Sequence, residues 1–200
     1  MTNKSARRKI RISFNSPVVL SFAGICLLSQ LLRLIMTDYT YHYIFSVYRA
    51  PFSVMSVVRL FTHVFGHSGW EHFIGNMMYF LLLGPMLEEK YGSKRLIVVI
   101  AIVSVVTGLF NILLFSSRAV LGASGVVFAF ILLASITRRD SGSIPLTFIL
   151  VAALYIGQQL LQIFKNDDVS QLSHIVGGAV GSVIGFIMDA RPQNSAGRLS

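Results

Sequence analysis

The sequence predicts an all-α membrane protein, a six-transmembrane-helix bundle with an interfacial loop between helices 1 and 2. Of its 200 residues, 54% are hydrophobic and only 12% are charged, whereas a soluble domain has about 25% charged residues. A mean hydropathy of +0.70 also argues against a soluble or disordered chain. A helix needs roughly 20 apolar residues to cross a bilayer. Six stretches approach or reach this length: 16–36, 70–87, 96–115, 119–137, 144–164 and 172–188.

The first predicted span, Ser16 to Met36, follows a basic segment and could therefore be the start of a signal peptide. Its apolar run is longer than the roughly 7–15 residues usual in a signal peptide. It also ends in Leu34-Ile35-Met36, without a small-x-small cleavage site. We therefore expect this segment to be retained as a membrane helix.

The connection between the first two spans, residues 37–69, is the longest and is rich in tyrosine and phenylalanine. Amphipathic aromatic rings favour the headgroup layer, which predicts that this loop lies in the membrane interface. Within it, Arg59 could bind lipid headgroups or brace the loop through backbone carbonyls, and we expect bracing. His63 and His67 are expected to form hydrogen bonds inside the loop.

The net charge of +9 comes from 17 Lys and Arg residues against 8 Asp and Glu. Six spans put both termini on one side, and that side holds 12 of the 17 basic residues. The positive-inside rule then predicts a multi-pass protein with both termini in the cytoplasm, so the charge indicates orientation and not a nucleic-acid partner. We expect a basic N-terminal segment at 1–15, a six-helix domain at 16–189 and a short polar tail at 190–200.

Four polar residues of the predicted spans lie at a similar depth. His72 and Asn76 share one face near the outer end of the second span. Ser124 lies about five residues below the start of the fourth span, and His174 lies near the start of the sixth. At about 1.5 Å of rise per residue, all four fall within roughly the outer third of the membrane. Because polar groups are costly there, their common depth predicts a shared site.

Small residues continue from His174 along one face of the sixth span. They are Gly177, Gly178, Gly181 and Gly185. Such spacing lets two helices approach closely, so His174 is expected to face a neighbouring helix. If that neighbour is the fourth span, a hydrogen bond between Ser124 and His174 becomes natural. The glycine face could instead drive dimerisation, but a buried histidine on it favours packing within the chain.

These residue types suit acyl transfer by a serine nucleophile. A hydroxyl becomes nucleophilic when an adjacent base takes its proton, and histidine is the usual base. All acidic residues lie at or beyond the ends of the spans, which predicts a Ser124–His174 dyad and not a triad. His72 and Asn76, with the backbone N–H of Ser124, suit an oxyanion hole.

Three motifs in this order resemble those of the rhomboid family of intramembrane serine proteases. The family's Gly-x-Ser-Gly matches Gly122 to Gly125, and its His-x-x-x-Asn matches His72 and Asn76. Its Ala-His-x-x-Gly-x-x-x-Gly matches 173–181, although residue 173 is serine here. The stretch 59–63, followed by two further histidines, is similar to the family's first-loop signature. The resemblance covers residues 16–189.

Two positions depart from the family pattern. Val58 stands where the family usually has tryptophan, which concerns the packing of the loop. Phe128 stands one turn after the serine, where the family often has a tyrosine stacked on the catalytic histidine, and a phenyl ring can also stack.

The resemblance implies a protease that cleaves transmembrane helices of other membrane proteins in the bilayer and uses no cofactor or metal. Gly122, Gly125, Phe128, Gly177 and Gly181 would support its site. The family's lateral gate corresponds to residues 144–171, and the bare six-helix core resembles bacterial members, which implies a bacterial inner membrane.

Other functions stay open at this point. A catalytically inactive rhomboid-like protein could bind or escort membrane proteins, although such relatives usually lack the serine or the histidine. A metal site is suggested by the spacing of His63, His67 and His72, but a metalloprotease needs glutamate in a His-Glu-x-x-His helix. A transporter would need charged or broken helices near the midplane. Ser124 could also be only a small packing residue.

Overall fold

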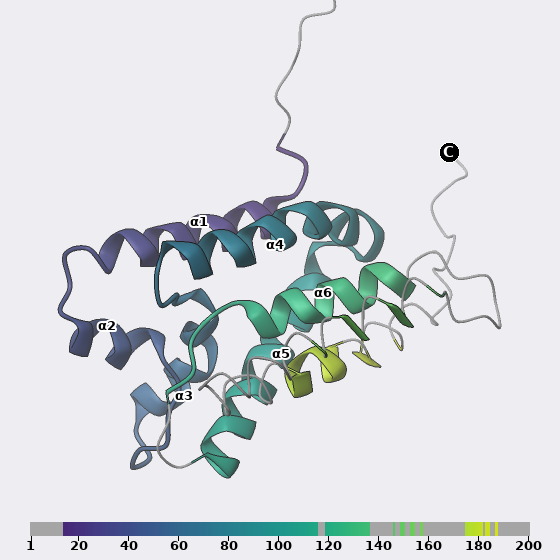
Figure 1. Ribbon diagram of the computed structural model, residues 1–200. Coiled ribbons are helices and arrows are strands. Elements are labelled where there is room, and N and C mark those ends of the chain that lie inside the picture. The colour runs from purple at the N-terminus through teal and green to yellow at the C-terminus, as the bar shows by residue number, and fades with distance from the viewer. Residues whose placement is uncertain are drawn as a thin grey trace, which may run out of the picture.

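The computed structural model describes residues 14–115 and 119–136, and in the last third of the chain residues 146, 149, 150, 153, 154, 157, 175–181, 183, 184 and 187. The elements named within these ranges are helical (Figure 1). In chain order they are α1 (Pro17–Leu32), α2 (Asp38–Phe45), α3 (Val54–Thr62), the 3₁₀ helix η1 (His63–Phe65), α4 (Trp70–Tyr91), α5 (Ser93–Leu114) and α6 (Ser124–Ile136). Residues 175–181 are also helical. The predicted all-α class is therefore confirmed.

The helices match the first four predicted spans in order but not in every boundary. In the described part of the chain, α5 is the one helix whose length and hydropathy both suit a membrane crossing. α4 is equally long at 22 residues but has charged residues at both ends. α1 and α6 have 16 and 13 residues. The basic segment, the C-terminal tail and most of 144–171 lie outside the described residues.

The predicted start of the fourth span at residue 119 is wrong. Val120 forms two backbone hydrogen bonds with Val47, each 2.9 Å long, and Gly122 has a φ of +129°. Neither conformation continues a helix, so α6 begins at Ser124. Ser124 is therefore the first residue of its helix and does not lie one turn inside it.

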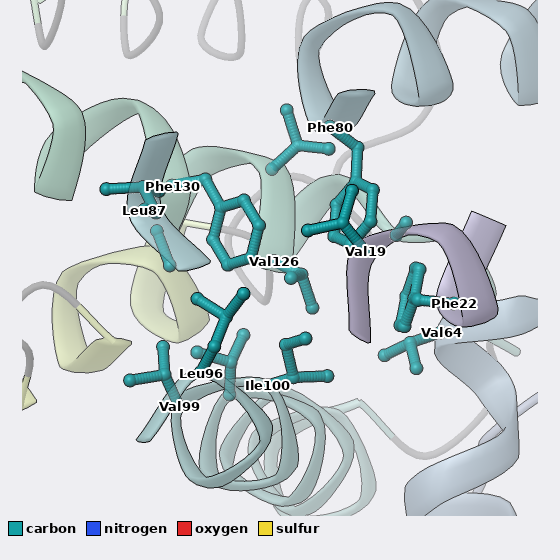
Figure 2. Close-up of a cluster of buried hydrophobic side chains, with 14 of the residues drawn as sticks. Val19, Phe22, Val64, Phe80, Leu87, Leu96, Val99, Ile100, Val126 and Phe130 are labelled. Carbon is teal, nitrogen blue, oxygen red and sulfur yellow. The ribbon is translucent and has the colours of Figure 1, made fainter. Parts of the chain in front are cut away.

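One hydrophobic core joins α1, α4, α5 and α6 (Figure 2). The ring of Phe80 in α4 stacks on Phe22 of α1 and on Phe130 of α6, with centroids 4.5 Å and 5.0 Å apart. α1 and α4 lie side by side (Figure 1). A Cβ atom at Gly84 would come within 2.7 Å of the Val19 side chain. Glycine at this position lets the two helices approach closely.

The glycine face predicted for the sixth span packs within the chain. A Cβ atom at Gly177 would meet Thr107 of α5, and one at Gly178 would meet the ring of Phe128 in α6. A Cβ atom at Gly181 would lie 2.6 Å from that of Ala129. Residues 175–181 therefore pack closely on both α5 and α6, as the small-residue spacing predicts.

The loop at 37–69 is folded into α2, α3 and η1, which gather at one end of the bundle (Figure 1). Arg59 is buried inside it. Its guanidinium group donates to the hydroxyls of Tyr48 and Ser56 and lies 4.1 Å from the centroid of the Tyr48 ring. The bracing role is confirmed, but the partners are hydroxyls and an aromatic ring where backbone carbonyls were expected.

At the N-terminal end of α1, the buried carboxylate of Glu88 connects α4 with α1 and α5. Its two oxygens accept the backbone N–H groups of Val18 and Val19, each at 3.0 Å. One of the same oxygens also accepts the hydroxyl of Ser93 at 2.7 Å. The first N–H groups of a helix have no partner within the helix. Glu88 at the end of α4 thus caps α1 and holds the start of α5.

We expect Glu88→Ala to lower the free energy of unfolding by about 1–3 kcal/mol, because two buried N–H groups of α1 lose their acceptor. Thermal unfolding of the purified protein in detergent measures this change. Glu89→Ala is the matched control, since Glu89 is the exposed neighbour, and it should change stability by less than about 0.5 kcal/mol. Equal shifts for both variants would contradict the capping role.

Candidate active site

Ser124 is held at the start of α6 by its connection to the interfacial loop. The bridge between Val47 and Val120 fixes the chain four residues before the serine. Closer to it, the N–H of Gly122 donates to the carbonyl oxygen of His63 at 2.9 Å. The Ser124 side chain is half-buried. At this position it lies beside the N–H groups of the first turn of α6, where the helix dipole favours negative charge.

Because Gly122 has no side chain, the side chains of His72 and Ser124 can border the same small space. A Cβ atom at Gly122 would lie 2.9 Å from Nε2 of His72 and 3.6 Å from Oγ of Ser124. Both side chains therefore face the space that a larger residue would fill. The φ of +129° at Gly122 is also one that residues with a Cβ rarely adopt. Gly125, the second residue of α6, is buried.

His72 and Asn76 lie one turn apart on α4, as the sequence predicts. Asn76 is buried, and its Nδ2 donates to the carbonyl oxygen of His72 at 3.0 Å. Because a primary amide has two donor hydrogens, this bond uses one of them. On the other side of the His72 ring, Nδ1 lies 3.0 Å from the hydroxyl oxygen of Ser68.

His174 lies outside the described residues. The residues that follow it, 175–181, are helical and pack on α6. There Phe128, one turn after Ser124, has its ring against Gly178. The helical residues 175–181, which follow His174 in the sequence, are therefore in close contact with the helix that begins at Ser124.

Two loop histidines lie beside this site, and both form the expected hydrogen bonds within the loop. Nδ1 of His63 pairs with the carbonyl oxygen of Arg59 at 3.0 Å, and Nδ1 of His67 pairs with that of Phe65 at 3.2 Å. Burial lowers the pKa of His63 to about 4. Burial, together with the nearby His72, lowers the pKa of His67 to about 3. Both rings are therefore neutral at pH 7.

The site and a group of basic residues lie near opposite ends of α1. Arg33, just after α1, donates to the carbonyl oxygen of His67 at 2.9 Å, which puts the C-terminal end of α1 beside the site. The N-terminal end of α1 is instead capped by Glu88, which is close in sequence to Lys90 in the last turn of α4 and Lys94 in the first turn of α5.

A family profile described as "Rhomboid domain" matches residues 55–191, more than half of the chain. The chain belongs to the rhomboid family. Rhomboid proteins are integral membrane proteins built as helical bundles, and the family acts on membrane-protein substrates in general. The resemblance seen in the three sequence motifs is thus confirmed.

Several curated proteins are similar to this rhomboid chain. The rhomboid protease GlpG of Haemophilus influenzae is 26% identical over 142 residues, which cover 70% of this chain and 73% of that protein. The rhomboid protease GlpG of Salmonella paratyphi A is 30% identical over 141 residues, covering 68% and 50%. RHOMBOID-like protein 1 of Arabidopsis thaliana is 28% identical over 144 residues, covering 68% and 36%. The chain thus spans half or less of two of these three relatives.

Proposed function

We propose that this rhomboid protein is an intramembrane serine endopeptidase that cleaves transmembrane segments through a Ser124–His174 dyad. The observation that carries the proposal is that Oγ of Ser124 and Nε2 of His72 both border the position that a Cβ atom of Gly122 would occupy. The side chain of His72 offers a donor beside the nucleophile, as acyl transfer requires. Two of the similar proteins are named rhomboid proteases, which supports this reaction.

In the proposed reaction, Oγ of Ser124 attacks the carbonyl carbon of the scissile peptide while His174 takes the hydroxyl proton. The carbonyl oxygen becomes an oxyanion, and the donors for it are His72, Asn76 and the N–H of Ser124. The C–N bond then breaks, and His174 gives its proton to the leaving amine. A water molecule, deprotonated by His174, hydrolyses the acyl-enzyme and restores Ser124. This chemistry needs no cofactor or metal.

The substrate helix must unwind before attack, because its carbonyl groups are hydrogen-bonded along the helix. Water must also reach the serine, which favours a site near the membrane surface. We place six spans in the membrane with both termini in the cytoplasm, so that the site lies in the outer layer. The lateral gate corresponds to residues 144–171, and the membrane is the inner membrane of a bacterium.

A fluorophosphonate probe of serine hydrolases tests the nucleophile directly, because it forms a covalent bond with an activated serine. We expect the purified protein to be labelled, and the label to be found by mass spectrometry on the peptide that contains Ser124. The competing function is an inactive rhomboid-like protein that binds or escorts membrane proteins. A folded protein that neither takes the label nor cleaves a model transmembrane substrate would favour that alternative.

A further inference from the structure

Ser68 contacts Nδ1 of His72, the ring nitrogen that does not border Gly122. Its hydroxyl oxygen lies 3.0 Å from Nδ1 of His72, and its backbone nitrogen lies 3.5 Å from the same atom. Ser68 lies between η1 and α4, and its side chain is exposed. The motifs that define the candidate site do not include this residue.

The two contacts of Ser68 with Nδ1 favour one position for the ring hydrogen of His72. An N–H group can only donate, so Nδ1 must be the acceptor in the bond from the Ser68 backbone. A neutral imidazole has one N–H, and its other nitrogen is an acceptor. The hydrogen is therefore on Nε2. The hydroxyl of Ser68 then donates to Nδ1 as well.

This tautomer directs the ring N–H toward the space beside Ser124 in which the oxyanion would form. Nε2 of His72 is the nitrogen beside Gly122, in the volume that Oγ of Ser124 also borders. With the hydrogen on Nε2, the ring can donate to an oxyanion in that volume. In the other tautomer, a lone pair would face the oxyanion and two N–H groups would face each other at Nδ1.

The backbone around Ser68 is fixed from the preceding residue. The N–H of His67 donates to the hydroxyl of Tyr41 at 2.9 Å. The carbonyl oxygen of His67 accepts from Arg33 at 2.9 Å. Tyr41 is fully buried and is also bonded to Ser29 of α1 at 3.1 Å. Ser68 is therefore presented to His72 by a chain segment that is anchored to α1 and α2.

We infer that Ser68 is a positioning residue, which holds neutral His72 in the tautomer whose Nε2–H donates to the oxyanion formed at Ser124. The inference rests on the proposed function for its kinetic consequence. The tautomer itself is a property of the resting protein and can be measured without any substrate.

Nitrogen NMR of the protein labelled with ¹⁵N-histidine tests the tautomer, because protonated and unprotonated ring nitrogens have well-separated shifts. The chain has five histidines, and His72→Gln identifies the two signals of His72 by their loss. We expect an unprotonated Nδ1 and a protonated Nε2 in the wild type and in Ser68→Thr. In Ser68→Ala, the shorter contact at Nδ1 is lost and only the backbone N–H at 3.5 Å remains. The two signals should therefore move toward each other as the second tautomer becomes populated.

Cleavage of a model transmembrane substrate tests the consequence. Ser68→Ala should lower kcat about tenfold with KM changed less than about twofold, because the donor is misoriented only in part. Ser68→Thr should restore most of kcat. Ser46→Ala is the matched control, since it removes a similar serine–histidine contact, 2.7 Å between Ser46 Oγ and His42 Nδ1, within the same loop. It should leave both the His72 signals and kcat unchanged.

A protonated Nδ1 in the wild type would overturn the inference, and so would unchanged His72 signals in Ser68→Ala. An equal loss of kcat in Ser68→Ala and Ser46→Ala would also overturn it, since it would indicate a general effect on the loop. If the wild type cleaves no substrate, the proposed function fails, while the NMR measurement still decides the role of Ser68.

Discussion

Replacing Ser124 with alanine is expected to lower cleavage of a reconstituted transmembrane substrate by at least about 10³-fold, because no other group can form the acyl-enzyme. The fold should not change, since the half-buried side chain loses only its oxygen. Ser135→Ala is the matched control in the same helix. The Ser135 hydroxyl is bonded to the carbonyl oxygen of Ile131 at 2.8 Å, away from the site, and its loss should change the rate less than about twofold.

His174→Ala should cause a loss of similar size, and combining it with Ser124→Ala should add almost nothing. Residues that act as one catalytic unit show this non-additive behaviour. Circular dichroism and thermal unfolding in detergent show whether each variant is folded. If the folded Ser124→Ala variant retained more than about a tenth of the wild-type rate, the serine would not be the nucleophile.

Much of the helical framework could be predicted from hydropathy alone. The second and third spans correspond to α4 and α5 within about four residues, because long apolar runs determine membrane helices strongly. The start of α6 could not be predicted in this way. The residues before Ser124 are apolar or small too, but Val120 pairs through its backbone with Val47, distant in sequence, and Gly122 has a φ of +129°.

The interfacial loop shows a second limit of the sequence pattern. Its aromatic content predicted a position in the headgroup layer but did not reveal α2, α3 and η1. α2 and α3 have N-caps, since the side chains of Thr37 and Ser53 accept N–H groups of the first turns at 3.2 Å. Serine or threonine before a periodic apolar segment is a usable signal for such starts.

The candidate site was predicted from motif order, but its supporting contacts were not. The same holds for Glu88 at the far end of α1, because its partners are backbone N–H groups of a helix distant in sequence. The role of Ser68 depends on such a contact too: it lies four residues before His72, just ahead of α4, and its hydroxyl reaches a side chain in the first turn. Contacts of this kind depend on loop geometry, which residue types do not specify.

Gly122 gives the sharpest test of the site geometry. Its motif position predicted a supporting role, and the structure gives two physical reasons for glycine. The φ of +129° strains any residue with a Cβ atom, at a cost of about 1–3 kcal/mol. That Cβ atom would also lie 2.8 Å from Cε1 of His72, closer than van der Waals contact allows.

We therefore expect Gly122→Ala to lower kcat by about 10²-fold or more, since displacement of His72 removes an oxyanion donor. KM should change much less, because Gly122 borders the reacting groups and not the length of a substrate helix. Gly75→Ala is the matched control, as a Cβ atom there would meet nothing within 4 Å. Both variants should be compared well below their unfolding temperatures, so that the difference in rate is not a loss of folded protein.

The probe reaction separates the two parts of this effect. If Gly122→Ala displaces only His72, fluorophosphonate should still label Ser124, but more slowly, because the nucleophile remains and one oxyanion donor is lost. If Gly122→Ala cleaved the substrate at the wild-type rate, the contact between the His72 ring and Gly122 would not be needed for catalysis. In that case, the donors to the oxyanion would have to come from the start of α6, where the N–H groups of the first turn already favour negative charge.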